Sequence, residues 1–528
     1  MTKKRPPRPP RPATPAAEHP SRPAGAHAPT DRKGIGVLPG LREISDPLGP
    51  FLLPLLLLVL ARIFAWLALP VASEDAYITF RYARHLASGH GLVYNPGDPV
   101  FGFSSPAWTL WTALGCALAQ DPVFWTRATT LLADALTLLL VGHMIERQAD
   151  GPGGRARAAA WCFTFFFAVW PYFSVVAMSG LESSTMLTLI ALTAVMARRG
   201  SVGAGPLLGL LALWRPEGVA CAAVIALGAR PRDRVVGVAV FAAGVAALTA
   251  YFGSPMPQSV IAKSSVYGTP GPWAGRYWWG WALPLRLNGM LATGEARQLS
   301  ALSVLLGPAA VAGAIALWRR RTSALALAVG ACLVVWLGYA LLGVAYFYWY
   351  LLLPLAGVAT LAAVGLPRLV RGGLLYAGIA LLVVTIWVDA HNLYVGRAQN
   401  EYYGFAAVAD WLRDHVRPGD KVMLEPIGIV GWRSPVVVVD EVGLVSPAVA
   451  KRRLQGPGWY ADVAGAERPD WIVVRRGALT GAAAFAGAGA PFRSRAERDT
   501  LFSRYAQATI VDEKVSGENA LVILQRVR

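Results

Sequence analysis

The chain has 528 residues, of which 55% are hydrophobic and 15% are charged, and its mean hydropathy is positive. This composition is too apolar for an ordinary soluble protein and indicates a polytopic membrane protein. The formal net charge of +18 could indicate a nucleic-acid partner. However, outside the C-terminal third the basic residues lie mostly in short clusters between apolar segments. That pattern is the orientation signal of membrane proteins, so we expect no nucleic-acid partner.

Residues 1–48 are basic and rich in proline, with nine prolines among the first 30 residues. We expect this segment to be disordered, because it cannot form an apolar core. The apolar run at 50–70 is long enough to remain as a spanning helix, and the positive-inside rule then puts the N-terminal tail in the cytoplasm. Arg62 lies in the middle of this run and is expected to face the helix bundle, with packing favoured over a substrate role.

Apolar segments of roughly spanning length continue to residue 389 and predict about 11 transmembrane helices in all. After 50–70, these segments are residues 122–146, 158–178, 183–197, 202–214, 216–229, 235–252, 298–318, 322–343, 347–366 and 372–389. Basic clusters follow alternate segments and all fall on the cytoplasmic side with this count. The count requires residues 106–120 to lie in the membrane interface. Residues 202–214 and 216–229 are short and are expected to be short or broken helices packed within the protein.

The composition changes after residue 390. Short β-branched runs such as "PVVVVDEVGLV" and "NALVILQRV" follow a helical segment and are separated by Gly, Pro and polar residues. They predict a soluble α/β domain over residues 391–528, which the helix count places outside the cytoplasm. We assign this domain no chemistry, because no GxGxxG, Walker, GxSxG or HExxH pattern occurs in a fitting context. The four cysteines all lie in apolar stretches, so neither a disulfide framework nor a thiolate metal site is expected.

The predicted first external loop, residues 71–121, begins with an acidic pair, Glu74 and Asp75. Helical spacing then places Tyr77 and Arg81 along one face. Acids and bases are therefore expected to converge on one pocket, where a carboxylate can take a proton from a sugar hydroxyl and cations can balance a phosphate leaving group. The alternative for this segment alone is an interfacial amphipathic helix with ordinary surface ion pairs.

Other motifs on the same predicted face also carry ionisable residues at helix ends. They are "MSGLESST" with Glu182, "LWRPEGV" with Arg215 and Glu217, and "GSPMPQSVIAKSS" with Gln258 and Lys263. Each motif alone is more often a helix cap or an interface anchor. Because they gather on one side with the acidic pair, they favour an active-site cavity for a polar, anionic substrate.

Residues 73–108, "SEDAYITFRYARHLASGHGLVYNPGDPVFGFSSPAW", resemble the first external loop of GT-C class integral-membrane glycosyltransferases. The resemblance is closest to the branch of the terminal β-arabinofuranosyltransferases, which use polyprenyl-phosphate sugars. "SGLESSTM", "WRPEGV" and "PMPQSVIAKSS" resemble further motifs of that branch in the same order, and the resemblance covers most of residues 50–450. It implies a GT-C-like catalytic domain over residues 49–390, followed by the external α/β domain.

The resemblance implies inverting transfer of a sugar from a polyprenyl-phosphate donor to an extracytoplasmic acceptor, a glycan or lipid of the cell envelope, at the plasma membrane. It also implies that an acidic residue of the first loop is the general base, with Asp75 the first choice and Glu74 the second. Many relatives have two aspartates where this chain has Glu then Asp. That difference leaves open how the two residues divide the work and whether a divalent cation takes part; no other cofactor is implied.

The resemblance implies substrate-binding roles for several further residues. Arg81, Arg215 and Lys263 are the candidates for the lipid phosphate, since arginine offers a two-pronged donor and lysine a point charge. The remaining candidates are Tyr77, Glu182 and Glu217, of which the two glutamates would hold sugar hydroxyls or pair with those cations. His90 and Asn95 follow in the second half of the loop, where a turn role is favoured over substrate contact.

Two other functions fit the same layout. A transporter or flippase of lipid-linked sugars would also be polytopic with a basic cavity. It is less favoured because the sequence shows no internal repeat and its acids cluster in an external loop instead of at the midplane. A non-catalytic envelope assembly protein is the other alternative. Neither the sugar nor the acceptor can be identified from these motifs.

Overall fold

The computed structural model describes residues 49–148, 154–266, 300–344, 347–370, 373, 396–485, 487, 489–511 and 517–527. The predicted N-terminal tail, residues 1–48, lies outside these residues, as does nearly all of the last predicted span, 372–389. Within the described residues, helices occupy the region up to Leu369, and all the strands follow after residue 420.

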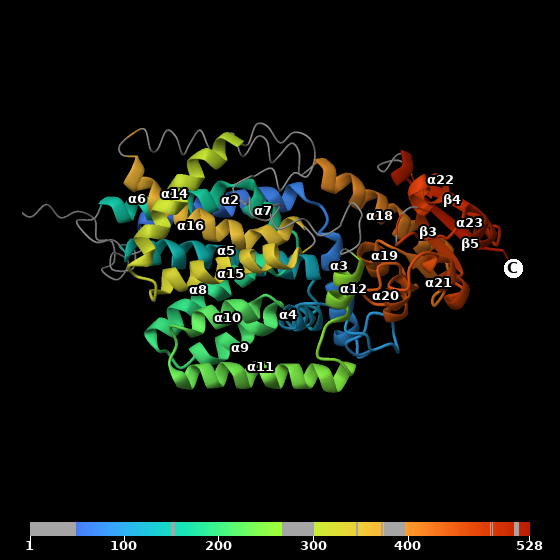
Figure 1. Ribbon diagram of the computed structural model, residues 1–528, viewed down its shortest axis with the longest axis horizontal. Coiled ribbons are helices and arrows are strands. Elements are labelled where there is room, and N and C mark those ends of the chain that lie inside the picture. Colours follow the sequence, from blue (N-terminus) through green and yellow to red (C-terminus); the bar gives the residue numbers. More distant parts are fainter. Residues whose placement is uncertain are drawn as a thin grey trace, which may run out of the picture. The chain divides into compact units, whose positions relative to one another are not determined.

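The predicted apolar segments before residue 370 each coincide with one or two helices (Figure 1). These are α2 (Leu52–Ala68), α5 (Pro122–Glu146), α6 (Gly154–Val169), α7 (Pro171–Ala177), α8 (Ser183–Arg199), α9 (Ala204–Trp214), α10 (Gly218–Ala226), α11 (Pro231–Phe252), α14 (Ser300–Trp318), α15 (Ala324–Leu342) and α16 (Leu352–Leu369), with the 3-10 turns η1 (Gly49–Phe51) and η3 (Tyr348–Leu351).

Several of these helices are long and apolar enough to cross a membrane, which confirms a multi-pass membrane protein. Among the described residues there are five such helices, or six if α6 and α7, bent by 57°, form one span. The bend falls at Pro171, which cannot donate the backbone hydrogen bond that would continue α6. Helices α9 and α10 are short, as predicted, whereas the total of about 11 spans stays a prediction.

A buried ion pair joins the first span to its neighbours. Arg62 in α2 is fully buried, and its Nε lies 2.7 Å from Oδ2 of Asp134 in α5. Ser174 of α7 accepts a hydrogen bond from Arg62 at 2.8 Å, and Ser184 of α8 donates one to Asp134 at 2.6 Å. This network ties four helices together, so the expectation that Arg62 faces the bundle is confirmed.

The predicted first external loop contains two helices, α3 (Glu74–Ala87) and α4 (Pro106–Ala117), and α12 (Gln258–Val266) follows the last turn of α11. Figure 1 shows α3 and α12 between the helical bundle and the C-terminal domain. Helix α4 corresponds to the segment predicted to lie in the membrane interface. Its depth in the membrane stays a prediction.

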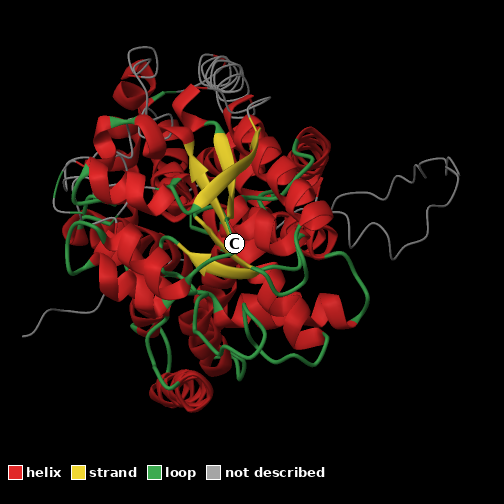
Figure 2. Ribbon diagram, turned by 90° about the vertical axis from the view of Figure 1, so that its right-hand side faces the viewer, coloured by secondary structure: helices red, strands yellow, loops and turns green. Residues whose placement is uncertain are grey.

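The C-terminal residues form the predicted α/β domain, with a five-stranded sheet of order β2-β1-β3-β5-β4 (Figure 2). Strand β1 pairs in parallel with β2 and β3, whereas β5 pairs antiparallel with β3 and β4. The elements are α18 (Gly396–His415), β1 (Lys421–Leu424), α19 (Ile427–Arg433), β2 (Val437–Asp440), α20 (Pro447–Arg453), α21 (Trp459–Glu467), β3 (Trp471–Arg475), α22 (Arg476–Thr480), η5 (Ala482–Phe485), α23 (Arg495–Phe502), β4 (Tyr505–Val511), η6 (Gly517–Asn519) and β5 (Leu521–Arg526).

Candidate active site

Glu74, the first residue of α3, holds the C-terminal domain. Its carboxylate accepts hydrogen bonds from the backbone N–H groups of Gly428 and Ile429, the latter at 2.8 Å. These N–H groups belong to the first turn of α19, where helical amides have no partner within the helix and a negative charge is favourable. The proposal of Glu74 as an alternative base stays untested, but its contacts favour a role in domain docking.

Arg81 and Asn95 also contact the C-terminal domain. The buried guanidinium of Arg81 donates to the carbonyl oxygens of Tyr94, Gly431 and Val436. The Asn95 amide donates to the Val438 carbonyl at 2.9 Å and accepts from the Val438 N–H at 3.0 Å, as a neighbouring strand would. Both predicted substrate contacts remain untested, and this geometry favours docking for both residues.

Two further candidates of the first loop, Tyr77 and His90, contact other groups than the acidic pair. The buried Tyr77 hydroxyl accepts a hydrogen bond from the Ala72 N–H at 3.3 Å, and its ring packs near Trp432 with 6.3 Å between ring centres. His90 is exposed, and its ring centre lies 5.7 Å from that of His85. These positions favour packing for Tyr77 and a surface position for His90.

Asp75 points to a different partner from Glu74. Its Oδ2 lies 3.2 Å from Nζ of Lys263 in α12, and the two side chains are 28% and 24% exposed. The ammonium of Lys263 also lies 4.8 Å from the ring centre of Phe347. A half-buried carboxylate therefore faces a half-buried cation, and that cation is Lys263 of another helix instead of Arg81, which the sequence had placed along one face with the acidic pair.

Three of the predicted residues form a buried acid–base network: Glu182, Arg215 and Glu217. The guanidinium of Arg215, whose side chain is 6% exposed, pairs with Oε1 of Glu182 and lies 2.5 Å from Oε1 of Glu217. Ser105 Oγ donates to Glu182 at 2.6 Å, and Tyr339 Oη donates to Glu217 at 2.7 Å. The network thus contains two carboxylates for one cation, with hydroxyl donors at both ends.

Helix ends bring this network together. Glu182 directly precedes α8, Arg215 directly follows α9, and Glu217 directly precedes α10. Gly180 allows the turn before Glu182, because its φ of +81° suits glycine and a Cβ there would lie 3.1 Å from that of Ala72.

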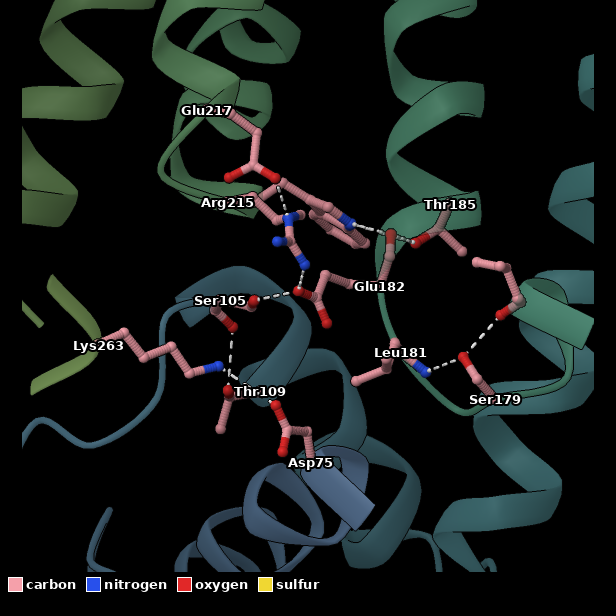
Figure 3. A network of polar contacts seen from close by, with 12 residues as sticks. Asp75, Ser105, Thr109, Ser179, Leu181, Glu182, Thr185, Arg215, Glu217 and Lys263 are labelled. Carbon is pink, nitrogen blue, oxygen red and sulfur yellow. Dashed lines mark hydrogen bonds and ion pairs between the residues drawn. The ribbon is translucent and has the colours of Figure 1, made fainter. Parts of the chain in front are cut away.

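The network and the pair of Asp75 and Lys263 lie in one region. The N–H of Ser73, two residues before Asp75, donates to the carbonyl of Ser179 in the Glu182 turn at 2.7 Å. Figure 3 shows Asp75 and Lys263 on one side of Ser105, with Glu182 and Arg215 on the other. The structure therefore brings together five of the predicted site residues, whereas Glu74, Arg81 and Asn95 face the C-terminal domain.

Two residues of the network were missed by the sequence reasoning. Ser105 lies within the quoted "SSPAW" ending, so its place in the external loop was a usable signal. Tyr339 lies in the uniformly apolar α15, where nothing in the pattern marks it. In the described part of the chain, no three His, Cys, Asp or Glu side chains gather closely enough to hold a metal ion. The involvement of a divalent cation therefore stays open.

Comparison with known proteins identifies the fold. Crystal structures of ArnT from Cupriavidus metallidurans, one bound to undecaprenyl phosphate and one in the apo state, each align with 89% of this chain at 13% sequence identity. Their TM-scores are 0.56 and 0.53, and the alignments cover 98% and 97% of the ArnT chains. This chain has the ArnT fold. The predicted GT-C resemblance is thereby confirmed at the level of the fold.

Other comparisons add less. Residues 391–517 match the family model of a domain of unknown function, DUF8728. No curated protein sequence matches the chain. The cryo-EM structure of the arabinofuranosyltransferase AftD from Mycobacteria aligns with 89% of this chain and 40% of its own at 17% identity. Its TM-score of 0.37 is too low to establish a shared fold.

Proposed function

We propose that the chain is an integral-membrane inverting glycosyltransferase. It would transfer a sugar from a polyprenyl-phosphate donor to an extracytoplasmic acceptor such as a cell-envelope glycan. The observation that carries this proposal is the half-buried pair of Asp75 and Lys263 beside the acid–base network, in a chain with the ArnT fold. The ArnT structure with undecaprenyl phosphate supports the donor class.

Asp75 is the proposed general base. Its carboxylate would accept the proton of the acceptor hydroxyl while that oxygen attacks the anomeric carbon. The bond between this carbon and the phosphate oxygen breaks at the same time, and the polyprenyl phosphate leaves with the electron pair. Attack from the face opposite the leaving group inverts the anomeric centre.

Lys263 is the proposed phosphate contact. Its ammonium would balance the charge that develops on the leaving phosphate. Because Lys263 pairs with Asp75 at 3.2 Å, donor binding would draw the ammonium toward the phosphate and release the carboxylate to accept a proton. Substrate entry and activation of the base would then be one event.

The acid–base network is proposed to hold sugar hydroxyls. Arg215 lies between two carboxylates, so its charge is already balanced and a phosphate is the less suitable ligand. Glu182 and Glu217 carry one negative charge in excess of Arg215 and would accept hydrogen bonds from the donor sugar. With the N-terminus in the cytoplasm of a plasma-membrane protein, this region would face outward.

The replacement Asp75→Asn tests the proposal. We expect sugar transfer to fall about 10²- to 10⁴-fold, the contribution typical of a general base. Donor binding should persist, because Lys263 remains. The products are measured by mass spectrometry of envelope glycans and lipid-linked sugars, comparing cells that lack the protein with cells complemented by each variant. Binding of undecaprenyl phosphate to the purified chain is measured separately.

The matched control is Asp98→Asn, which removes an exposed carboxylate from the same external loop. It should leave both product formation and donor binding unchanged. Unchanged product formation in Asp75→Asn would overturn the proposal of a transferase that uses this base.

A further inference from the structure

A cavity of about 220 Å³ lies in the C-terminal domain, outside the proposed active site. It opens at the ends of the three parallel strands: Glu425 follows β1, Glu441 follows β2, and Arg475 ends β3. The chain runs from the central β1 to β2 on one side and later to β3 on the other. The carboxyl ends of parallel strands at such a reversal are where open α/β sheets bind ligands.

The polar groups of this cavity are held in fixed positions. Tyr460 Oη lies 2.9 Å from Oε1 of Glu441, and Arg453 Nη1 donates to the Glu441 carbonyl at 2.8 Å. On the β1 and β3 side, Arg475 Nε lies 3.1 Å from Oε2 of Glu425. Hydrogen-bond donors and acceptors therefore both line the cavity.

The rest of the lining is apolar and aromatic. Trp459 and Tyr460 are buried and form part of the wall, and Val473 and Leu521 extend the apolar surface. Few polar groups at fixed positions in an apolar lining are typical of a small-molecule site. The volume is below the roughly 300–1,000 Å³ usual for drug-sized ligands, so the cavity suits a single ring.

The charges indicate which kind of ring fits. Two carboxyl groups and two guanidinium groups line the cavity, and the guanidinium of Arg475 is already paired with Glu425. The carboxylate of Glu425, beside Arg475, would repel a phosphate ester or a sugar acid. A neutral ring with several hydroxyl groups can both donate to carboxyl oxygens and accept from guanidinium N–H groups. A sugar unit has this chemistry.

The cavity also adjoins the helix that carries Lys263. Val266 lies at the cavity edge, one helical turn after Lys263 in α12. Gln258, at the start of α12, donates from Nε2 to the Gly443 carbonyl at 3.0 Å, which anchors the helix to the segment after β2. One short helix therefore connects the cavity to the proposed phosphate contact.

We infer that this cavity, here called the sugar cavity, binds one neutral sugar unit of the acceptor glycan and so holds the acceptor beside the active site. This assignment rests on the proposed transferase function. It extends the sequence analysis, which assigned the C-terminal domain no chemistry, because it gives the domain a binding role without a reaction of its own.

Ligand binding to the full chain in lipid nanodiscs tests the inference. The probes are neutral arabinan, mannan and galactan oligosaccharides, with inorganic phosphate as the anionic probe, followed by saturation-transfer NMR. We expect at least one neutral oligosaccharide to bind and phosphate not to compete with it. The replacement Glu441→Gln should raise the Kd about tenfold, since it puts an NH2 group, which cannot accept a hydrogen bond, in place of one carboxyl oxygen.

A second variant blocks the cavity without removing a polar group. Ala478 of α22 lines the cavity and is half-buried, so Ala478→Phe should fill the space and abolish oligosaccharide binding. The matched control is Glu467→Gln in the same domain, whose side chain is 36% exposed and pairs with Lys421 outside the lining. It should bind like the unmodified chain.

The inference is overturned if no neutral oligosaccharide binds, if phosphate competes, or if binding survives both Glu441→Gln and Ala478→Phe. The transferase proposal can fail separately. Suppose that Asp75→Asn loses sugar transfer while neither cavity variant changes oligosaccharide binding. That result would overturn the sugar cavity and leave the transferase proposal standing. If Asp75→Asn still transfers sugar, the cavity has no role in holding an acceptor for this transferase. This holds even if the cavity variants abolish oligosaccharide binding.

Discussion

Glu74 and Asp75 are adjacent in the sequence, yet they contact different parts of the protein. Successive residues of an α-helix point about 100° apart, so the start of α3 turns Glu74 toward α19 and Asp75 toward Lys263. The order of choice for the base, Asp75 before Glu74, is therefore the one that the geometry favours. A carboxylate that accepts two helix amides is poorly placed to accept a substrate proton.

Glu441 makes the stability of the C-terminal domain depend on pH. Burial raises the pKa of its carboxyl from 4.5 to about 8, with smaller opposing effects from Tyr460 and Arg453. Between these pH values the unfolded chain has lost the proton that the folded domain keeps. The free energy of unfolding of this domain should therefore fall as the pH rises from about 4.5 to 8.

Hydrogen exchange of C-terminal peptides, corrected for intrinsic rates, measures this dependence between pH 5 and 8. The replacement Glu441→Gln should flatten it between about pH 6 and 8, because the amide does not titrate; below that range Asp440, whose pKa burial raises to about 6, adds a slope of the same sign. The control Glu467→Gln should keep the slope of the unmodified chain. An equal slope in the Glu441→Gln variant would contradict this prediction.

At the scale of elements, the helices were predictable from apolar runs of spanning length. In a membrane such a run has to form a helix, because its backbone groups need hydrogen-bond partners within the segment. The breaks between α6 and α7 and between α9 and α10 coincide with prolines, Pro171 and Pro216. Which faces of these helices meet was not predictable. Asp134 lies 72 residues from Arg62, and no local pattern links the two.

Replacing Arg62 and Asp134 tests whether their ion pair stabilises the packing of α2 in the bundle. The replacement Arg62→Met leaves Asp134 as a buried charge without its cation and should cost about 3–5 kcal/mol of stability. The double replacement Arg62→Met with Asp134→Leu should recover much of that loss, because neither charge remains. Thermal unfolding of the detergent-purified chain provides the comparison. Equal destabilisation in the single and double variants would show that the charges themselves do not matter.

At the scale of the whole molecule, the first external loop holds the C-terminal domain through contacts more than 300 residues apart in sequence. Arg81 bonds Gly431 across 350 positions, and Asn95 bonds Val438 across 343. The same loop carries Asp75. Docking of the domain and placement of the proposed base therefore depend on one segment, and the sugar cavity is held near that segment through α12.

The replacement Glu74→Gln tests this docking. It removes the negative charge at the start of α19 and should increase hydrogen exchange at the amides of Gly428 and Ile429 several-fold. The control Asp98→Asn removes an exposed charge from the same loop and should leave exchange at these amides unchanged. Unaltered exchange in Glu74→Gln would show that the carboxylate does not hold α19.

By itself, the sequence determined a multi-pass helical protein, a C-terminal α/β domain, and the motifs that carry ionisable residues. Apolar length and strand periodicity are local properties, so they can be read from short stretches. Tertiary structure alone decided which of those residues meet. Arg81 was a candidate for the lipid phosphate and Asn95 was expected to have a turn role, yet both bond backbone groups of the C-terminal domain. A long-range contact depends on how distant segments pack against each other. That packing cannot be read from either segment alone.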